Sequence, residues 1–299
     1  MVRTNATELD GISMQASTRI AFVTVCKGRL HHVQQTLPLL LAQSPDEVVV
    51  VDYDCPQQVG DWVQAHHPSV KVVRVHDAEG FCLSRGRNAG AHASTAPWIC
   101  FIDADVMVSH GWLDWMRSQL REHAFYRQAR DLGGSVSDSG CYGTFVCPRH
   151  GFDAVQGYDE VFRGWGGEDD DIYDRLVGCG FADATYPAEY VRSIPHEDSE
   201  RVAFHAVKRK IDQHAINRFY RSAKMQLMAF YRIRGELPLP LRRQVQDRVN
   251  AAFEARIANP GAPLPKVDFS VSIAEGLTST HRLVKRCVLS LQMEEMPEP

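Results

Sequence analysis

The sequence of 299 residues lacks several features that would assign it to a broad class directly. It has no run of about 18 apolar residues, so no segment is expected to span a membrane. Its first residues, MVRTNATELDG, lack the basic and then apolar segments of a secretion signal. None of its eight cysteines forms a Cys-x-x-Cys pair, which excludes the common zinc and redox motifs. We therefore expect a soluble, cytoplasmic protein whose cysteines are buried, reduced thiols.

An excess of charge of one sign is also missing, because 33 basic residues accompany 37 acidic ones and the net charge is −4. This balance gives no overall field to attract nucleic acid, so no nucleic-acid partner is expected. Residues 207–234 form a local exception, with basic, apolar and aromatic residues at helical spacing. An amphipathic helix packed on the body explains this pattern, and peripheral contact with an anionic acceptor or with lipid head groups is the alternative.

The chain does contain apolar strand-like runs that alternate with helical patterns after a polar arm at residues 1–18. The runs occupy residues 19–26, 47–51, 70–75 and 98–102, and the helical patterns follow residue 29 and cover 83–95. This alternation predicts an α/β fold with a mostly parallel central sheet flanked by helices.

The pattern changes after residue 110. Helices are expected over 112–126, 168–177 and 204–234, short strands over 133–150, and a strand over 189–194. A break, NPGAPLP, at 259–265 precedes a tail of undefined structure. We predict three parts: the flexible arm 1–18, a main domain 19–205, and a mainly helical extension 206–299.

Aspartates follow two of the expected strands. Asp52 and Asp54 end the second strand, and Asp103 and Asp105 end the fourth within the string FIDAD. The carboxyl ends of parallel strands meet at the ligand crevice of such sheets, so these side chains can converge on a divalent cation. Oxygen ligands suit Mg²⁺ or Mn²⁺. The alternative is that the aspartates only cap the next turn or helix.

Four consecutive acids occur in the string GWGGEDDDI, directly after a glycine-rich loop. Ile172 and Leu176 have the spacing of one buried helix face, which places Glu168 to Asp171 in the first turn. The helix dipole stabilises each charge there by only about 0.3–1 kcal/mol, so repulsion among four acids is not obviously offset. One carboxyl with a raised pKa could act as a general base. An inert acidic first turn is the alternative.

The string FCLSRGRNAGAHASTAPWICFIDADV resembles the family 2 glycosyltransferases of GT-A fold. The resemblance implies a nucleotide-diphosphate sugar donor that contacts Arg87, Asn88 and Asp103, with its phosphates held by a metal ion. Asp52 matches the position that contacts uracil in the family. Tyr53 stands where many members have a second aspartate, which leaves open whether Asp52 or Asp54 contacts the base.

The string GWGGEDDDIYDRL is nearly identical to a signature of the β-1,4-galactosyltransferases and related bacterial transferases. Together the two similarities cover roughly residues 19–200. This resemblance implies that Asp169 is the general base and that Glu168 and Asp170 hydrogen-bond the hydroxyls of the acceptor. Trp165 would cover the sugar, with a place in the core as the alternative.

The glycines before the acidic run suggest a closing loop, and the same resemblance implies a metal site. Gly166 and Gly167 would belong to a loop that closes over the donor, because glycine adopts backbone angles that other residues avoid. A histidine some 25 residues after the acidic run completes the metal shell in the related families. His196 fits this position and would bind the metal with Asp103 and Asp105. His205 is the nearby competitor.

These observations predict a metal-dependent, inverting glycosyltransferase that uses Mn²⁺ or Mg²⁺. It would move a hexose or N-acetylhexosamine, with galactose or N-acetylgalactosamine favoured, from a UDP-sugar to a carbohydrate or glycosylated acceptor, in glycan or polysaccharide synthesis. One alternative is a sugar-phosphate nucleotidyltransferase, for which Cys26-Lys27-Gly28-Arg29 is a faint candidate for the triphosphate loop. The other is a non-catalytic carbohydrate-binding module.

Overall fold

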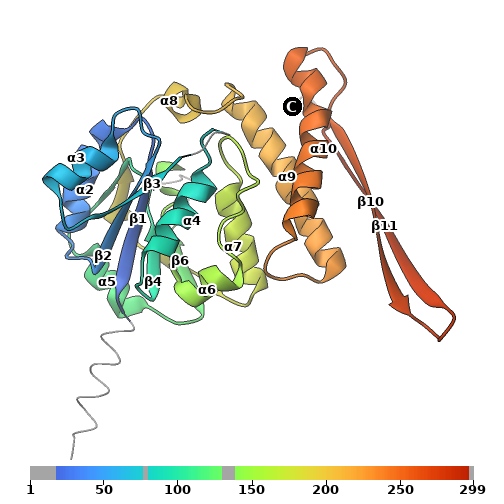
Figure 1. The fold of residues 1–299 in the computed structure, drawn as a ribbon, viewed down its shortest axis with the longest axis horizontal. Coiled ribbons are helices and arrows are strands. Elements are labelled where there is room, and N and C mark those ends of the chain that lie inside the picture. The colour runs from blue at the N-terminus through green and yellow to red at the C-terminus, as the bar shows by residue number, and fades with distance from the viewer. Residues whose placement is uncertain (1–17, 77–79, 130–138, 296–299) are drawn as a thin grey trace, which may run out of the picture.

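The structure, a computed structural model, describes residues 18–76, 80–129 and 139–295. The expected arm lies almost wholly outside these residues, as do positions 133–138 of the segment expected to form short strands. Figure 1 shows a central sheet covered by helices, with two long helices and a β-hairpin from the carboxyl-terminal part of the chain beside it. The expected α/β class with a mostly parallel central sheet is confirmed.

The central sheet has seven strands in the order β3-β2-β1-β4-β7-β6-β8. β1 pairs in parallel with both β2 and β4, and β2 pairs in parallel with β3. The strands of this parallel half are β1 (Ile20–Cys26), β2 (Glu47–Tyr53), β3 (Lys71–Val75) and β4 (Trp98–Phe101). The helices that connect them are α2 (Leu30–Leu41), α3 (Val59–His66) and α4 (Leu83–Ala93). The four predicted strands are confirmed, and their carboxyl ends share one edge of the sheet.

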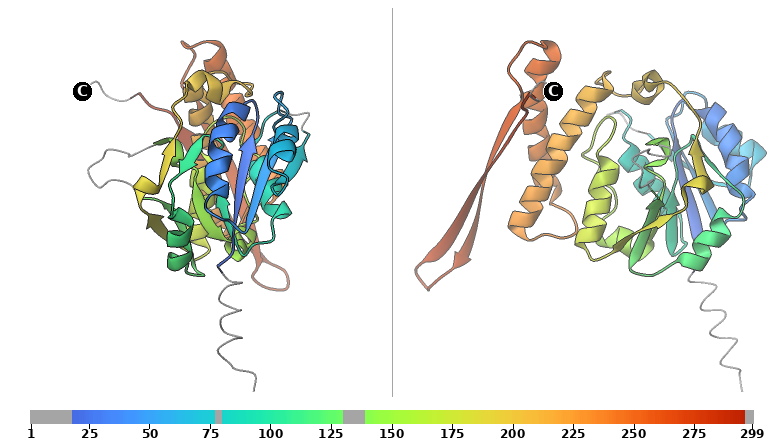
Figure 2. Two further views of the ribbon diagram at one scale, coloured as in Figure 1. Left: turned by 90° about the vertical axis from the view of Figure 1, so that its left-hand side faces the viewer. Right: turned by 180° about the vertical axis from the view of Figure 1, so that it is seen from behind.

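Both faces of the parallel half are buried, as the continuous apolar runs of its strands require. Phe22 and Val50 point into a core that α2 and α3 complete. Val23 and Val51 point into a second core on the opposite face, under α4. Figure 2 shows the helices on the two sides of the sheet from the side and from behind.

Two glycines let α4 lie very close to the sheet. A Cβ atom at Gly90 would lie 2.3 Å from Val23 Cγ1, and one at Gly86 would lie 2.7 Å from Val25 Cγ1. Their i, i+4 spacing puts both on the helix face that meets β1. The close approach fixes the position of Arg87, which lies between them in the chain.

The other half of the sheet departs from the sequence prediction. The helix expected over 112–126 ends earlier, as α5 (Trp112–Gln119), and β6 (Ala124–Gln128) follows. β6 is antiparallel to β7 (Phe145–Pro148) and parallel to β8 (Ala182–Tyr186), while β7 is antiparallel to β4. The prediction was wrong here because the short apolar run that begins β6 suits a helix or a strand, and pairing with two distant strands decides.

Shorter elements surround the edge where the parallel strands end. The helix expected over 168–177 is confirmed as α7 (Glu168–Gly178), preceded by α6 (Arg149–Ala154). A small antiparallel sheet joins β5 (Val106–Val108) to β9 (Val191–Ser193), and α8 (Asp198–Val202) follows. The strand expected over 189–194 is shorter because Ala188–Tyr190 form a 3₁₀ turn. This small sheet brings the segment after β9 beside the loop after β4.

The carboxyl-terminal part forms a third core from α9 (Lys210–Tyr231), α10 (Leu239–Ala258) and a hairpin of β10 (Lys266–Gly276) and β11 (Arg282–Gln292). The tail after the NPGAPLP break, whose structure the sequence left undefined, thus forms two long strands beside the two helices. Residues near the base of the hairpin alternate between apolar and polar, and Phe269 pairs with Leu289 across it. Figure 1 shows the hairpin reaching away from the sheet.

The basic segment 207–234 mostly belongs to α9, which is amphipathic as expected. Its buried face contains Ile216, Tyr220 and Leu227 and packs in the third core. Within the described residues, no helix combines the length and the apolar composition needed to cross a membrane. Contact of the exposed basic face with lipid head groups or with an anionic acceptor stays a prediction.

Candidate active site

One pocket collects residues from six separate parts of the chain. It is bounded by the loop after β1, the segment that leads into α4, the loop after β4, residue 140, the glycine loop with the start of α7, and the segment after β9. Most of the predicted acids and histidines are in its wall or next to it. Its charged and aromatic lining residues include Arg29, Asp103, Asp105, Trp165, Glu168, His196 and His205.

Arg87 contacts two carboxylates: Asp103, which was assigned to donor binding, and Asp169, which was assigned as the general base. Its guanidinium is 2% exposed and donates to Asp103 Oδ1 at 2.7 Å and to Asp169 Oδ1 at 2.5 Å. It also donates to the Tyr158 hydroxyl at 3.2 Å. Burial raises the pKa of the Asp169 carboxyl, and the charge of Arg87 opposes this rise. Asp103 and Asp169 therefore lie on two sides of one buried cation.

Because Gly143 has no side chain, there is room beside it for the side chains of Arg87, Asp103 and Asp169. A Cβ atom at this position would lie 2.6 Å from Arg87 Nη2, 3.0 Å from Asp169 Oδ2 and 3.1 Å from Asp103 Oδ2. Any larger residue would displace charged groups that hold one another. Sequence reasoning missed Gly143, because it belongs to no recognisable motif and reaches the site only through the fold.

The acidic run begins α7, as its spacing predicted, and its first three members meet different partners. Glu168 is buried, and its Oε2 atom has no hydrogen-bond partner among the described residues. Burial, followed by the charge of Asp169, raises the pKa of Glu168 to about 8. Asp170 accepts a hydrogen bond from the Tyr142 hydroxyl. Glu168 and Asp169 thus both have a carboxyl whose pKa is raised by burial.

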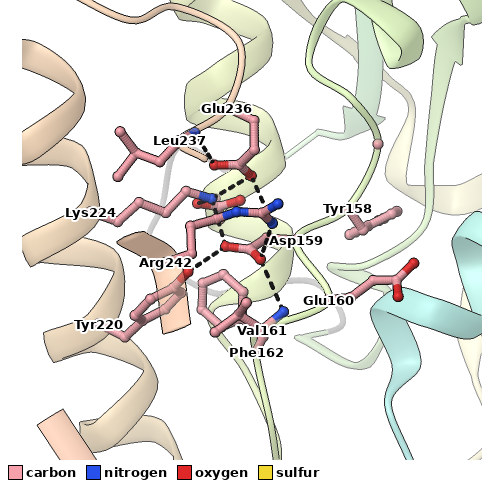
Figure 3. A network of polar contacts seen from close by, with 12 residues as sticks. Tyr158, Asp159, Glu160, Val161, Phe162, Tyr220, Lys224, Glu236, Leu237 and Arg242 are labelled. Carbon is pink, nitrogen blue, oxygen red and sulfur yellow. Dashed lines mark hydrogen bonds and ion pairs between the residues drawn. The ribbon is translucent and has the colours of Figure 1, made fainter. Parts of the chain in front are cut away.

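The fourth acid, Asp171, faces away from the pocket into a buried network of charges. Its carboxylate contacts Arg175 Nη2 at 2.7 Å and Lys224 Nζ at 2.8 Å. Lys224 also contacts Asp159 at 2.8 Å and Glu236 at 2.7 Å, as Figure 3 shows for these two acids. Three carboxylates surround one ammonium group from α9, a position that a metal ion could otherwise fill. The network joins α7 to the carboxyl-terminal helices.

The glycine loop before α7 is also held by α9. Gly164, Gly166 and Gly167 have φ angles of 80°, 84° and 96°, which other residues rarely adopt. The Asn217 amide of α9 donates to the Gly166 carbonyl at 2.7 Å. Trp165 is half-buried and lines the pocket, so its alternative place in the core is not observed.

His196 has a free ligand atom, as the predicted metal site requires. Its Nδ1 lies 2.9 Å from the Ile194 carbonyl oxygen and 3.2 Å from Asp105 Oδ2. Its Nε2 is buried and has no partner among the described residues. A buried imidazole nitrogen without a partner, beside a carboxylate, suits a divalent cation.

The complete predicted metal set is not assembled. In the described part of the chain, two groups of three ligand residues have all their ligand atoms within 4.8 Å of one another, and Asp103, Asp105 and His196 do not form such a group. Asp103 instead contacts Arg87, and Asp105 contacts Arg29 Nη1 at 3.3 Å. His205, the competitor of His196, lines the same pocket.

Asp52 and Asp54, the two candidates for contact with the nucleotide base of the donor, are not among the residues that line the pocket. Asp52 is buried and accepts hydrogen bonds from the backbone of Cys55 at 2.9 Å and of Gly60 at 3.0 Å. Asp54 pairs with His76. The position of Asp52 at a strand end is as expected. Its carboxylate hydrogen-bonds the turn before α3 and the second residue of that helix. Contact of either aspartate with a base stays a prediction.

Asn88 also has a role within the fold. Its amide nitrogen donates to the Tyr158 carbonyl at 2.9 Å and to Glu160 Oε1 at 2.9 Å. Its amide oxygen accepts from the Tyr158 backbone at 2.8 Å. Asn88 thus ties α4 to the loop that precedes the acidic run, while its neighbour Arg87 contacts the acids themselves.

We expect the raised pKa of Glu168 to make stability depend on pH. Because its pKa rises from 4.5 to about 8 on folding, the folded state binds more protons between these values. This stability contribution is present below pH 4.5 and is lost as the pH rises through about 8. The free energy of unfolding should fall by up to about 1.4 kcal/mol per pH unit. Urea unfolding of the protein and of Glu168→Gln at pH 5–8 checks this, and equal slopes would contradict it.

Two family models match this chain. The model described as glycosyl transferase family 2 matches residues 21–130, and the model described as the N-terminal domain of galactosyltransferase matches residues 125–197. Among solved structures, a mannosyltransferase from Pyrobaculum calidifontis in complex with GDP-Man and Mn²⁺ is similar in fold, with a TM-score of 0.52. The identity is 14%, over 79% of this chain and 75% of that chain. The two models together cover nearly all of the chain from β1 to β9, including Asp103, Asp105 and the acidic run at the start of α7.

Proposed function

We propose that this chain, a GT-A glycosyltransferase in which a family 2 segment continues into a galactosyltransferase-like segment, is an inverting enzyme that uses a UDP-sugar. Galactose or N-acetylgalactosamine would be transferred to a hydroxyl of a carbohydrate or glycosylated acceptor, in glycan or polysaccharide synthesis. The observation that carries the proposal is the pair of carboxylates, Asp103 and Asp169, on the two sides of Arg87 beside one pocket.

Asp169 is proposed as the general base. Its carboxylate would accept the proton of the acceptor hydroxyl while that oxygen attacks the anomeric carbon of the donor. The bond from the anomeric carbon to the UDP oxygen breaks, and its electron pair leaves with UDP, so the configuration inverts. A carboxyl with a raised pKa is a stronger base than an ordinary aspartate, and burial supplies the rise.

Asp103, Asp105 and His196 would hold a divalent cation, Mn²⁺ or Mg²⁺. When bound, the cation would supply positive charge for the leaving diphosphate. The unpartnered Nε2 of His196 and the burial of Asp105 support this set. Burial raises the pKa of Asp105, and the adjacent Arg29 and His196 oppose the rise, so a further cation nearby would favour its ionised form.

Glu168, Asp170 and Trp165 would contact the acceptor and the transferred sugar. A carboxyl with a pKa of about 8 is protonated at neutral pH, so Glu168 could donate a hydrogen bond as well as accept one. Trp165 offers an apolar ring at the pocket wall, where Lys210 Nζ lies 4.2 Å from the ring centroid. Gly166 and Gly167 would contact the donor through their backbone.

The donor is tested by thermal unfolding in the presence of Mn²⁺ with UDP-galactose, UDP-N-acetylgalactosamine, UDP-glucose and GDP-mannose. A ligand at 100 times its dissociation constant should stabilise the folded protein by about 2.7 kcal/mol. We expect the two favoured UDP-sugars to do so, and Asp103→Asn to lose the effect. Asp114→Asn, an exposed aspartate on α5, is the matched control and should keep it. Stabilisation by GDP-mannose alone would contradict the proposed donor.

A further inference from the structure

Two histidines and a glutamate meet beside the pocket, although they are far apart in the sequence. His31 and His32 are at the start of α2, and Glu200 is in α8. One ligand atom from each lies within 4.8 Å of one from both others. The two imidazole rings have centroids 4.1 Å apart. No residue of this group belongs to the set assigned above to the catalytic metal.

None of the three side chains has a hydrogen-bond or ion-pair partner among the described residues. No such contact is observed for the imidazoles of His31 and His32 or for the Glu200 carboxylate. His32 is 2% exposed, and its Nδ1 is buried without a partner. Because a buried polar group without a partner destabilises the fold, this arrangement needs a reason beyond packing.

The imidazoles of His31 and His32 supply nitrogen ligands, because a ring nitrogen with a free lone pair binds a metal ion. Glu200, on the exposed side of the group, brings a carboxylate to the two imidazoles.

We propose that His31, His32 and Glu200 bind a second divalent cation, for which Zn²⁺ is the best match. Two imidazole nitrogens and one carboxylate are a common ligand set for zinc, with the fourth position taken by water. Mg²⁺, which prefers oxygen ligands, fits this set poorly.

The cation would join α2 to α8 at the wall of the pocket. Glu200 lines the pocket, and the ring centroid of His32 lies 5.6 Å from that of His196. Binding would therefore hold the segment after β9, which contains His196, against α2. We expect Zn²⁺ to raise the unfolding temperature of the protein in the absence of any nucleotide.

The test measures metal binding directly and needs no enzymatic activity. The purified protein is freed of metal with a chelator and titrated with Zn²⁺, and with Co²⁺ for its visible absorption when bound by imidazoles. We expect His31→Ala and Glu200→Gln to weaken Zn²⁺ binding at this site by more than about 10-fold. Loss of a residue that only hydrogen-bonds a ligand already lowers metal affinity by about 10-fold or more, and these two residues would be ligands themselves. His110→Ala, an exposed histidine outside the group, is the matched control and should bind like the unchanged protein.

His196→Ala separates this site from the proposed catalytic one. If His31, His32 and Glu200 form the site, the His196→Ala protein keeps the Zn²⁺ and Co²⁺ signals that His31→Ala loses. The proposal is overturned if the unchanged protein binds no Zn²⁺, if Glu200→Gln binds it as tightly as the unchanged protein, or if His196→Ala abolishes binding. A failed donor screen would leave these results unaffected.

Discussion

Asp169→Asn should reduce the turnover of sugar transfer by about 10²–10⁴-fold, the usual contribution of a general base. The amide has nearly the shape of the carboxylate but cannot accept the proton of the acceptor hydroxyl. Arg87 would still contact Asp103, so the buried guanidinium keeps one carboxylate partner. The measurement is the release of UDP in the presence of acceptor, donor and Mn²⁺, together with the unfolding temperature.

Asp174→Asn is the matched control for this variant. Asp174 is on the same helix, is exposed, and pairs with Arg221 outside the pocket. Its replacement removes the same charge from α7 and should leave turnover nearly unchanged. Near-normal turnover of Asp169→Asn, with a folded protein, would remove Asp169 from the mechanism. A large loss in both variants would instead indicate a general effect of charge on the helix.

Lys224→Met should destabilise the folded protein by about 3–5 kcal/mol, the usual cost of removing one partner from a buried ion pair. The ammonium of Lys224 is fully buried and contacts Asp159, Asp171 and Glu236. Methionine fills a similar volume but leaves these acids close together. Among the described residues, Arg175 and Arg242 are then the basic side chains that contact them. Urea unfolding at pH 8 measures the loss.

Lys285→Met provides the comparison for an exposed ion pair. Lys285 contacts Glu275 at 2.8 Å on the hairpin, and both side chains are about half exposed. Exposed pairs contribute about 0–1 kcal/mol, so this variant should be nearly as stable as the unchanged protein. The loss from Lys224→Met should also shrink as the pH falls, because burial raises the pKa of the Glu236 carboxyl and its protonation relieves the repulsion. Equal stability of the two variants would contradict the role given to the buried network.

The first half of the fold follows closely from the sequence. The runs around β1, β2 and β4 are β-branched and apolar on both faces, and strands buried on both sides need that composition. Between them, apolar residues recur at helical spacing, so α2 was predicted correctly from Val33 and Leu37. β6 and the terminal hairpin could not be predicted, because short apolar runs suit either helix or strand until a partner strand is known.

The candidate site was only partly visible in the sequence. The strings that contain Asp103 and Asp169 identified both acids, and the fold places them beside one pocket. No motif indicated that Arg87 connects them or that Gly143, which lies between the two acidic segments in the chain, is beside all three side chains. The sequence also suggested that Asp52 or Asp54 contacts the base of the nucleotide, which stays a prediction, and the Asp52 carboxylate accepts hydrogen bonds from the backbone of Cys55 and Gly60.

By itself, the sequence determined the family resemblance, the parallel half of the sheet and the position of four acids in the first turn of α7. These are local properties, because residue order sets periodicity and helix ends. Only the tertiary structure decided how those acids divide, with Asp169 beside Arg87 at the pocket and Asp171 beside Lys224 in the interior. The pKa of a carboxyl depends on burial and on charges within a few ångströms. Those neighbours come from segments far away in the chain, so their order along the sequence does not reveal them.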